Sequence, residues 1–214
     1  MTMTGRAFAA AAGALLTALV SLLTLPAARA QSIIDQWTSV KAPPAPVLKP
    51  VAVDSKTTAL LVLGFTTKNC GRRPHCIATI PAVKTLLDEA RAAKVTVVYS
   101  IVTGTTAADV VKELAPMPDE PSVISGPDKF INTDLGKILA DKGIKTVIAT
   151  GTASNGSVLF TGAGAVMRGM SVIVPIDTLS GENDFDDLTT VYTFAYGPVI
   201  AEKSTLTKVD MIKF

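Results

Sequence analysis

The sequence predicts a three-layer α/β domain, with helices on both faces of a mostly parallel sheet of about six strands. Two observations support this fold class. From residue 58 onward strand-like apolar runs alternate with helix-like segments, and the runs over 58–65 and 144–150 are nearly unbroken in their apolar character. Continuous apolar runs are typical of strands buried on both faces, and strand–helix alternation is typical of parallel sheets. In such folds the site lies beyond the carboxyl ends of the strands.

Each element follows from a local pattern. The expected strands are residues 58–64, 95–101, 122–125, 144–150, 171–176 and 206–212. The expected helices are residues 78–94, a short segment near 107–114, a segment from Thr133 to Gly143, and residues 156–169 and 184–196. In the first of these helices, Ile80, Val83 and Leu87 recur with the period of one helical face.

The first 30 residues have the pattern of a secretory signal peptide. A positive charge at Arg6 precedes an apolar run over residues 7–25, and a small-x-small site occupies residues 28–30. The run is nearly long enough to be a membrane anchor instead. The break at Pro26 and the cleavage-type site favour removal after Ala30. We therefore expect a periplasmic or secreted protein that has no membrane contact after cleavage.

The remaining chain is expected to contain an arm and one domain. Prolines at positions 43, 44, 46 and 50 favour an extended N-terminal arm over residues 31–57, followed by a domain over residues 58–214. Removing residues 1–30 takes away Arg6 and Arg29, so 20 basic residues fall to 18, against 18 acidic ones. This balance gives no reason to expect nucleic acid or an anionic membrane surface as a partner.

Cys70 and Cys76 are the two cysteines of the chain, in the stretch KNCGRRPHC. In an oxidising compartment their spacing, with Gly71 and Pro74 between them to turn the chain, favours a disulfide. The alternative is a metal site made by Cys70, His75 and Cys76. That set is geometrically awkward, and the sequence has no second histidine to complete it.

Three segments carry a resemblance to a known family. They are the run TALLVLGF at 58–65, Phe130 followed by Thr-Asp-Leu at 133–135, and the block 146–177. In order and spacing they resemble the opening strand, the Phe-x-x-Thr-Asp-Leu segment and the nucleophile strand, turn and helix of the isochorismatase-like cysteine hydrolase superfamily. That superfamily includes isochorismatases, nicotinamidases and related amidohydrolases. Typical family residues in the last block are Thr161, Ala165, Arg168, Gly169 and Asp177. The resemblance implies an isochorismatase-like, Rossmann-like fold and a homo-oligomer.

The resemblance also indicates that the family's catalytic triad is replaced. The position of its aspartate falls on Gly64, that of its lysine on Ile124 or Ser125, and that of its cysteine on Ser157. We expect a gap beside Gly64 where the carboxylate would stand. The family's metal sites use an aspartate and histidines, which His75 alone does not rebuild, so no metal or other cofactor is expected.

Ser157 has two interpretations. It is either a nucleophile with Lys129 as its base, or a residue in the first turn of a helix whose hydroxyl bonds to the backbone while Lys129 is solvated. A serine hydroxyl needs a base beside it, so the replaced aspartate favours the second interpretation. The resemblance implies backbone amides arranged as an oxyanion hole and a non-proline cis peptide bond near Thr152–Ala153.

Several polar residues would still make a site for a small molecule. The candidate binding residues are Thr66, Asn69, Ser125, Thr152, Ala153, Ser154 and Asn155. Arg72 and Arg73 in the cysteine loop could meet a carboxylate or phosphate, although a solvated loop is the simpler interpretation. The sequence favours an exported, catalytically degenerate protein that acts in small-molecule binding or assembly. The alternatives are an amide or ester hydrolase that uses Ser157 and a structural subunit of a periplasmic complex.

Overall fold

The computed structural model describes residues 32–214, and the predicted signal peptide lies outside this part of the chain. By their contacts, residues up to Pro44 form one unit and Ala45–Phe214 form another. In the first unit residues 33–39 form turns, closed by bonds such as the one that the Ser39 amide donates to the Gln36 carbonyl (2.9 Å). The named helices and strands all belong to the second unit.

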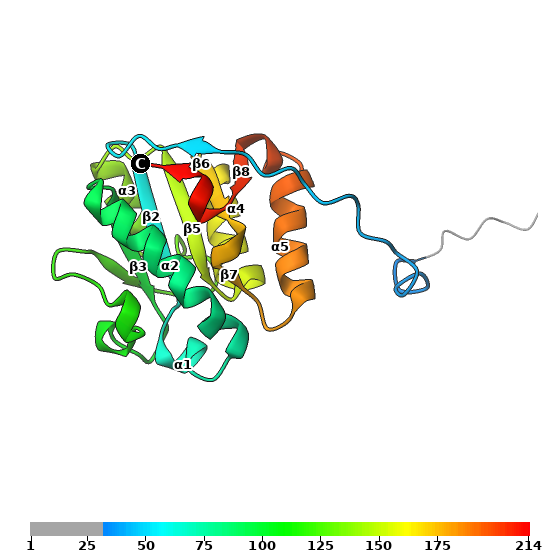
Figure 1. Ribbon diagram of the computed structural model, residues 1–214, viewed down its shortest axis with the longest axis horizontal. Coiled ribbons are helices and arrows are strands. Elements are labelled where there is room, and N and C mark those ends of the chain that lie inside the picture. Colours follow the sequence, from blue (N-terminus) through cyan, green and yellow to red (C-terminus); the bar gives the residue numbers. More distant parts are fainter. Residues whose placement is uncertain (1–31) are drawn as a thin grey trace, which may run out of the picture. The chain divides into compact units, whose positions relative to one another are not determined.

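A seven-stranded sheet forms the centre of the second unit (Figure 1). Its strand order is β4-β3-β2-β5-β6-β8, β7 pairs with β5, and every pairing is parallel. The strands are β2 Thr58–Leu63, β3 Thr96–Ile101, β4 Ser122–Ile124, β5 Thr146–Thr152, β6 Ser171–Pro175, β7 Leu179–Ser180 and β8 Ser204–Thr207. The predicted parallel sheet is therefore confirmed, with β5 in its interior beside β2.

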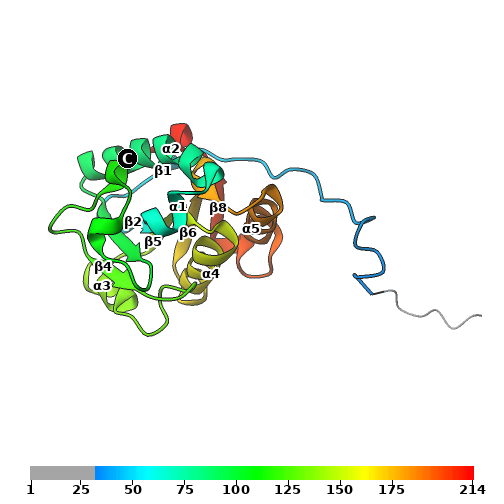
Figure 2. The same ribbon diagram turned by 90° about the horizontal axis from the view of Figure 1, so that it is seen from below.

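Helices cover both faces of this sheet. They are α1 Thr67–Cys70, α2 Pro74–Ala92, α3 Leu135–Asp141, α4 Leu159–Met167 and α5 Asp184–Tyr196. Seen from below, α2 lies on one side of the strands, and α3 and α4 lie on the other (Figure 2). Phe194 of α5 packs in the same apolar cluster as α3 and α4. The three-layer prediction is confirmed.

The alternation of side chains along the strands determines which residues each helix layer covers. In β2, Leu60 packs in the cluster of α2, whereas Leu61 packs in the cluster of α3, α4 and α5. In β5, Ile148 belongs to the α2 cluster, and Val147 and Ala149 belong to the other. Because successive side chains of a strand point to opposite faces, the even-numbered residues at the end of β5 face α2.

Some predicted boundaries are wrong. The last strand ends at Thr207, because the Val209 amide donates to both oxygens of the Asp177 carboxylate (3.2 Å each) and a 3₁₀ turn follows at Val209–Met211. Residues 107–114 form two short 3₁₀ turns, the first closed by hydrogen bonds between Thr106 and Asp109. In both places local polar bonds stop the regular element that the apolar pattern suggests.

Two further elements differ from the sequence expectation. Within the predicted arm, β1 Val51–Ala52 pairs in parallel with β9 Ile212–Lys213 and forms a small second sheet. The predicted helix over 156–169 is a π-helical turn at Ser154–Val158 followed by α4.

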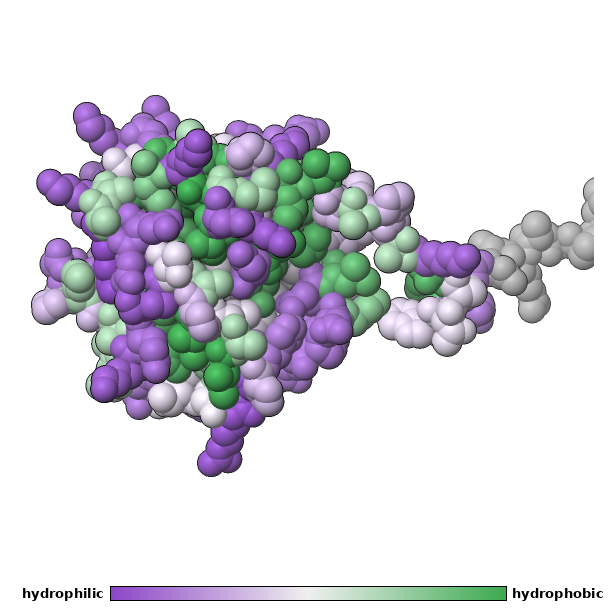
Figure 3. Space-filling model, viewed as in Figure 1, coloured by the Kyte–Doolittle hydropathy of each residue, from purple (hydrophilic) through white to green (hydrophobic). Residues whose placement is uncertain are grey.

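The space-filling view draws one face of the second unit (Figure 3). It shows hydrophilic residues over much of this face, with hydrophobic residues in smaller groups between them. Within residues 32–214, the helices are too short or too polar to cross a bilayer.

Candidate functional site

Gly64 follows β2 at the carboxyl edge of the sheet, and its backbone leaves no room for a side chain. Its φ is +74°, in the left-handed region that favours glycine. A Cβ built on Gly64 would lie 2.5 Å from the backbone oxygen of Thr152 and 3.5 Å from Nδ2 of Asn69. The expected gap beside Gly64 is therefore absent, because the Thr152 carbonyl occupies that space.

The turn after β5 brings Ser157 to the same edge of the sheet. It begins with a cis peptide bond between Thr152 and Ala153, at the position that the resemblance implied. The π-helical turn at Ser154–Val158 then leads into α4, so Ser157 lies just before the α-helix rather than in its first turn. Ser157 is 9% exposed.

Lys129 is buried, which contradicts the expectation that it is solvated. Only 3% of the residue is exposed, and its backbone amide donates to Thr161 Oγ1 in α4 (3.2 Å). Its ammonium group donates to the Gly126 carbonyl (2.7 Å) and not to Ser157. Burial lowers the pKa of Lys129 to about 8, although Asp128 opposes this effect.

The two positions that align with the family lysine lie at the end of β4, the edge strand of the sheet. Ile124 is exposed, and the Ser125 hydroxyl donates to the Gly126 carbonyl (3.1 Å). Ile124 and Ser125 line a surface depression of about 340 Å³ together with Gly126, Pro127, Asp128, Ile131 and Asn132. None of the other predicted binding residues lines this depression.

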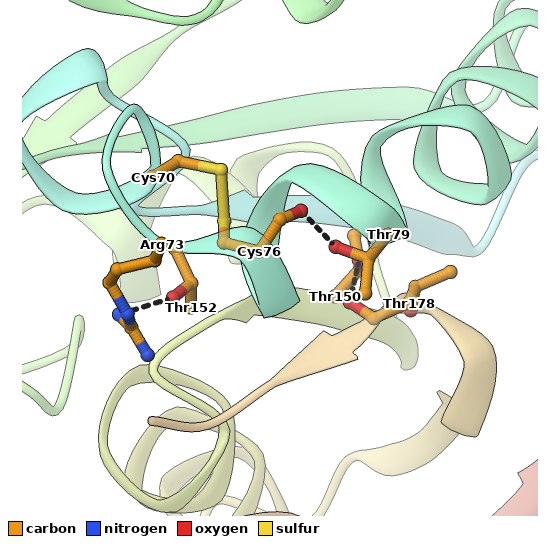
Figure 4. The surroundings of a disulfide bond; sticks show 7 residues. All are labelled: Cys70, Arg73, Cys76, Thr79, Thr150, Thr152 and Thr178. Carbon is orange, nitrogen blue, oxygen red and sulfur yellow. Dashed lines mark hydrogen bonds between the residues drawn. A yellow bond between two sulfur atoms is a disulfide. The ribbon is translucent and has the colours of Figure 1, made fainter. Parts of the chain in front are cut away.

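The cysteine loop places Arg73, but not Arg72, at the site. Cys70 and Cys76 form the predicted disulfide, with Cα atoms 5.3 Å apart, which rules out the metal alternative. Arg72 is exposed. Arg73 precedes α2, and its Nη1 donates to Thr152 Oγ1 (2.9 Å), as Figure 4 shows. By charge alone, the two arginines are equivalent. Proline suits the first helical position, so Pro74 was a signal that the loop ends at Arg73.

The remaining predicted binding residues lie around the same edge. Thr66 and Asn69 lie at the start of and within α1, after β2. The hydroxyls of Thr66 and Ser154 are buried and have no hydrogen-bond partner among residues 32–214. Asn155 is held by its side-chain amide, which donates to the Asp186 carboxylate of α5 (2.8 Å).

Two further polar groups lie near this edge. His75 Nε2 lies 3.3 Å from Asp187 Oδ2, and Asp187 Oδ1 accepts a bond from the Gly181 amide (2.7 Å). Ser180 pairs in register with Thr152, and its buried hydroxyl has no partner within the described chain. The first contact depends on α5 lying beside the start of α2, and the second depends on β7 pairing with β5. Local sequence patterns predict neither arrangement. In residues 32–214 no three His, Cys, Asp or Glu side chains are placed to hold a metal ion.

Solved structures with the same fold come from the isochorismatase and amidase families. An isochorismatase family protein from Desulfovibrio vulgaris is 18% identical with a TM-score of 0.65, covering 72% of this chain and 95% of that one. N-carbamoylsarcosine amidase from Thermoplasma acidophilum is 21% identical with a TM-score of 0.62, covering 72% of this chain and 97% of that one. At these identities the likeness shows the fold alone.

The family itself is shown by the sequence. A family model for the isochorismatase domain matches residues 58–198, and the chain belongs to the isochorismatase-like superfamily. A curated relative from Bacillus subtilis (strain 168), the "Uncharacterized isochorismatase family protein YaaI", is 28% identical over 104 residues. That alignment covers 47% of this chain and 58% of the relative, so it spans less than two thirds of that protein.

Proposed function

We propose that this chain is an exported small-molecule-binding protein, built on the isochorismatase-like scaffold without the hydrolytic reaction of the family. The observation that carries the proposal is the backbone at Gly64. The position that aligns with the family aspartate has a φ of +74°, and a Cβ there would lie 2.5 Å from the Thr152 carbonyl oxygen. A carboxylate cannot stand at this position unless the backbone moves.

The surroundings of Ser157 support the loss of the reaction. A serine hydroxyl is a weak nucleophile at its free pKa and needs an adjacent base. The candidate base, Lys129, donates its ammonium group to the Gly126 carbonyl and not to Ser157. The polar groups that remain around the edge, among them Thr152, Ser154 and Asn155, suit binding better than bond cleavage.

Export is part of this proposal. A buried disulfide between Cys70 and Cys76 supports it, because structural disulfides persist in oxidising compartments. On the resemblance alone, we also propose that the exported chain forms a homo-oligomer. Fractionation of cells that express the full chain tests export, and light scattering of the purified protein tests its oligomeric state.

The catalytic part of the proposal is tested with a panel of small amides, esters and enol ethers. The wild type, Ser157→Ala and a control, Ser171→Ala at the exposed start of β6, are compared, and a nicotinamidase serves as the positive control of the assay. We expect no turnover above background in any of the three proteins. Turnover that persists in Ser171→Ala and vanishes in Ser157→Ala contradicts the proposal.

One observation favours an active hydrolase as the second candidate. Burial lowers the pKa of Lys129 to about 8, so a sizeable fraction of its amine is neutral near physiological pH. A serine–lysine pair would require the Lys129 side chain to leave the Gly126 carbonyl and reach Ser157. This candidate predicts that Ser157→Ala and Lys129→Met abolish the same turnover, and that a serine-reactive phosphonate labels the wild type only.

A further inference from the structure

One edge of the Arg73 guanidinium is buried without a partner. Nη1 donates to Thr152 Oγ1, whereas Nη2 is buried and has no hydrogen-bond partner among residues 32–214. An unpaired donor on a charged group is strongly unfavourable in a buried position, and such groups in native proteins call for a specific explanation. Arg73 as a whole keeps partial exposure, although its Nη2 atom is buried.

A second unpaired donor lies on the same face of the sheet. Ser180 of β7 is the register partner of Thr152 in β5. Its neighbour Leu179 packs in the cluster of α3, α4 and α5, so the Ser180 side chain points to the opposite face, toward α2. Thr152 faces α2 as well, since it accepts the bond from Arg73 at the start of that helix. The Ser180 hydroxyl is buried and unpaired in the described chain.

The positive charge of Arg73 is not neutralised by a neighbouring acid. Asp186 and Asp187 of α5 have other partners. Asp186 accepts bonds from Asn155 and the Glu182 amide, and Asp187 contacts His75 and the Gly181 amide. No carboxylate in residues 32–214 lies within ion-pair distance of Arg73.

We propose that Arg73 and Ser180 bind the carboxylate of a small organic molecule at the carboxyl edge of β5 and β7. A carboxylate is a monoanion whose two oxygens accept N–H and O–H donors, which matches one guanidinium edge and a hydroxyl on the same face of the sheet. A phosphate dianion would call for a second positive charge. The inference rests on the proposed binding function and names the ligand class of that site.

The cysteine loop positions Arg73 for this contact. The disulfide closes the loop from Cys70 to Cys76, and Pro74 begins α2 directly after Arg73. In Figure 4 the guanidinium lies beside Thr152, on the side of the turn that follows β5. Arg72 shares the loop and the charge but is exposed, which makes it a matched control.

The test is a binding titration with acetate and benzoate, with acetamide and benzamide as neutral isosteres, and with inorganic phosphate. The proteins are the wild type, Arg73→Gln, Arg73→Lys and Arg72→Gln, each first checked for folding by circular dichroism. We expect the wild type and Arg72→Gln to bind the carboxylates equally and in preference to the amides and phosphate. Arg73→Gln should bind them about ten- to a hundredfold more weakly, since a hydrogen bond to a charged group is lost. Arg73→Lys should fall between, and it decides the matter if Arg73→Gln does not fold.

The outcomes separate this inference from the proposed function. Four results would each overturn the Arg73 site. The wild type and Arg73→Gln could bind carboxylates equally, or Arg72→Gln could lose as much affinity as Arg73→Gln. The wild type could also bind phosphate more tightly than carboxylates, or bind no carboxylate. None of these results bears on whether the protein catalyses hydrolysis. Conversely, Ser157-dependent turnover with Arg73-dependent carboxylate binding overturns the loss of catalysis and leaves the Arg73 site in place.

Discussion

Replacing Gly64 by alanine should destabilise the protein more than the same change at any open glycine turn. Two costs combine at this position. A non-glycine residue in the left-handed region costs about 1–2 kcal/mol, and φ at Gly64 is +74°. The new Cβ would also lie 2.5 Å from the Thr152 carbonyl oxygen, which is backbone and cannot rotate away. Added volume in a packed site costs about 1–3 kcal/mol. We therefore expect Gly64→Ala to lower the free energy of unfolding by about 2–5 kcal/mol.

Gly143→Ala is the matched control, because it separates the two costs. Gly143 has a φ of +66°, and a Cβ there would meet no atom within 4 Å. Gly143→Ala should therefore lower the free energy of unfolding only by the conformational cost, about 1–2 kcal/mol. Urea unfolding of the wild type and both variants measures the difference, provided that the slope with denaturant is unchanged. If Gly64→Ala is no less stable than Gly143→Ala, the contact with Thr152 does not constrain this edge, and the main support for a lost carboxylate position is gone.

Two further predictions concern stability. Removing the disulfide with Cys70→Ala and Cys76→Ala, which lie six positions apart, should lower the free energy of unfolding by about 2 kcal/mol, from the entropy of closing a short loop. Intact mass before and after reduction verifies the bond, and an unchanged urea midpoint would contradict the estimate. Burial lowers the pKa of Lys129 from 10.5 to about 8, so the folded protein binds fewer protons than the unfolded chain between these values, and stability should rise with pH in that window. Relative to Lys129→Met, the free energy of unfolding of the wild type should rise by up to about 3 kcal/mol between pH 8 and 10.5. If the two proteins show parallel pH profiles of stability, burial does not lower the pKa of Lys129.

The elements that depend on apolar periodicity could be predicted from the sequence. The runs that became β2, β3 and β5 are buried along almost their whole length, so their composition reports a sheet covered on both faces. The disulfide was predictable too, because its two cysteines are close in the chain. The boundaries at Val209 and Asp109 were not, since polar bonds to Asp177 and Thr106 end or close these segments.

The candidate site shows the limit of local patterns most clearly. The resemblance to the family placed Gly64 and Ser157 at one edge of the sheet. It could not show that the Thr152 carbonyl fills the space beside Gly64. Nor could charge alone show that Arg73 is partly buried while Arg72 is exposed, or that Lys129 is buried. Burial and hydrogen bonding of a long polar side chain depend on elements distant in sequence.

The sequence by itself determined the layers, the parallel sheet and the family of this protein, because hydrophobic periodicity and motif spacing are properties of neighbouring residues. Only the tertiary structure decided the character of the site. Thr152 and Ser180 face the same layer because β7 pairs with β5 in one register, and Arg73, which directly precedes α2, bonds to Thr152. These contacts are set by the packing of whole elements, and they leave Nη2 of Arg73 and the hydroxyl of Ser180 each buried without a partner in the described chain.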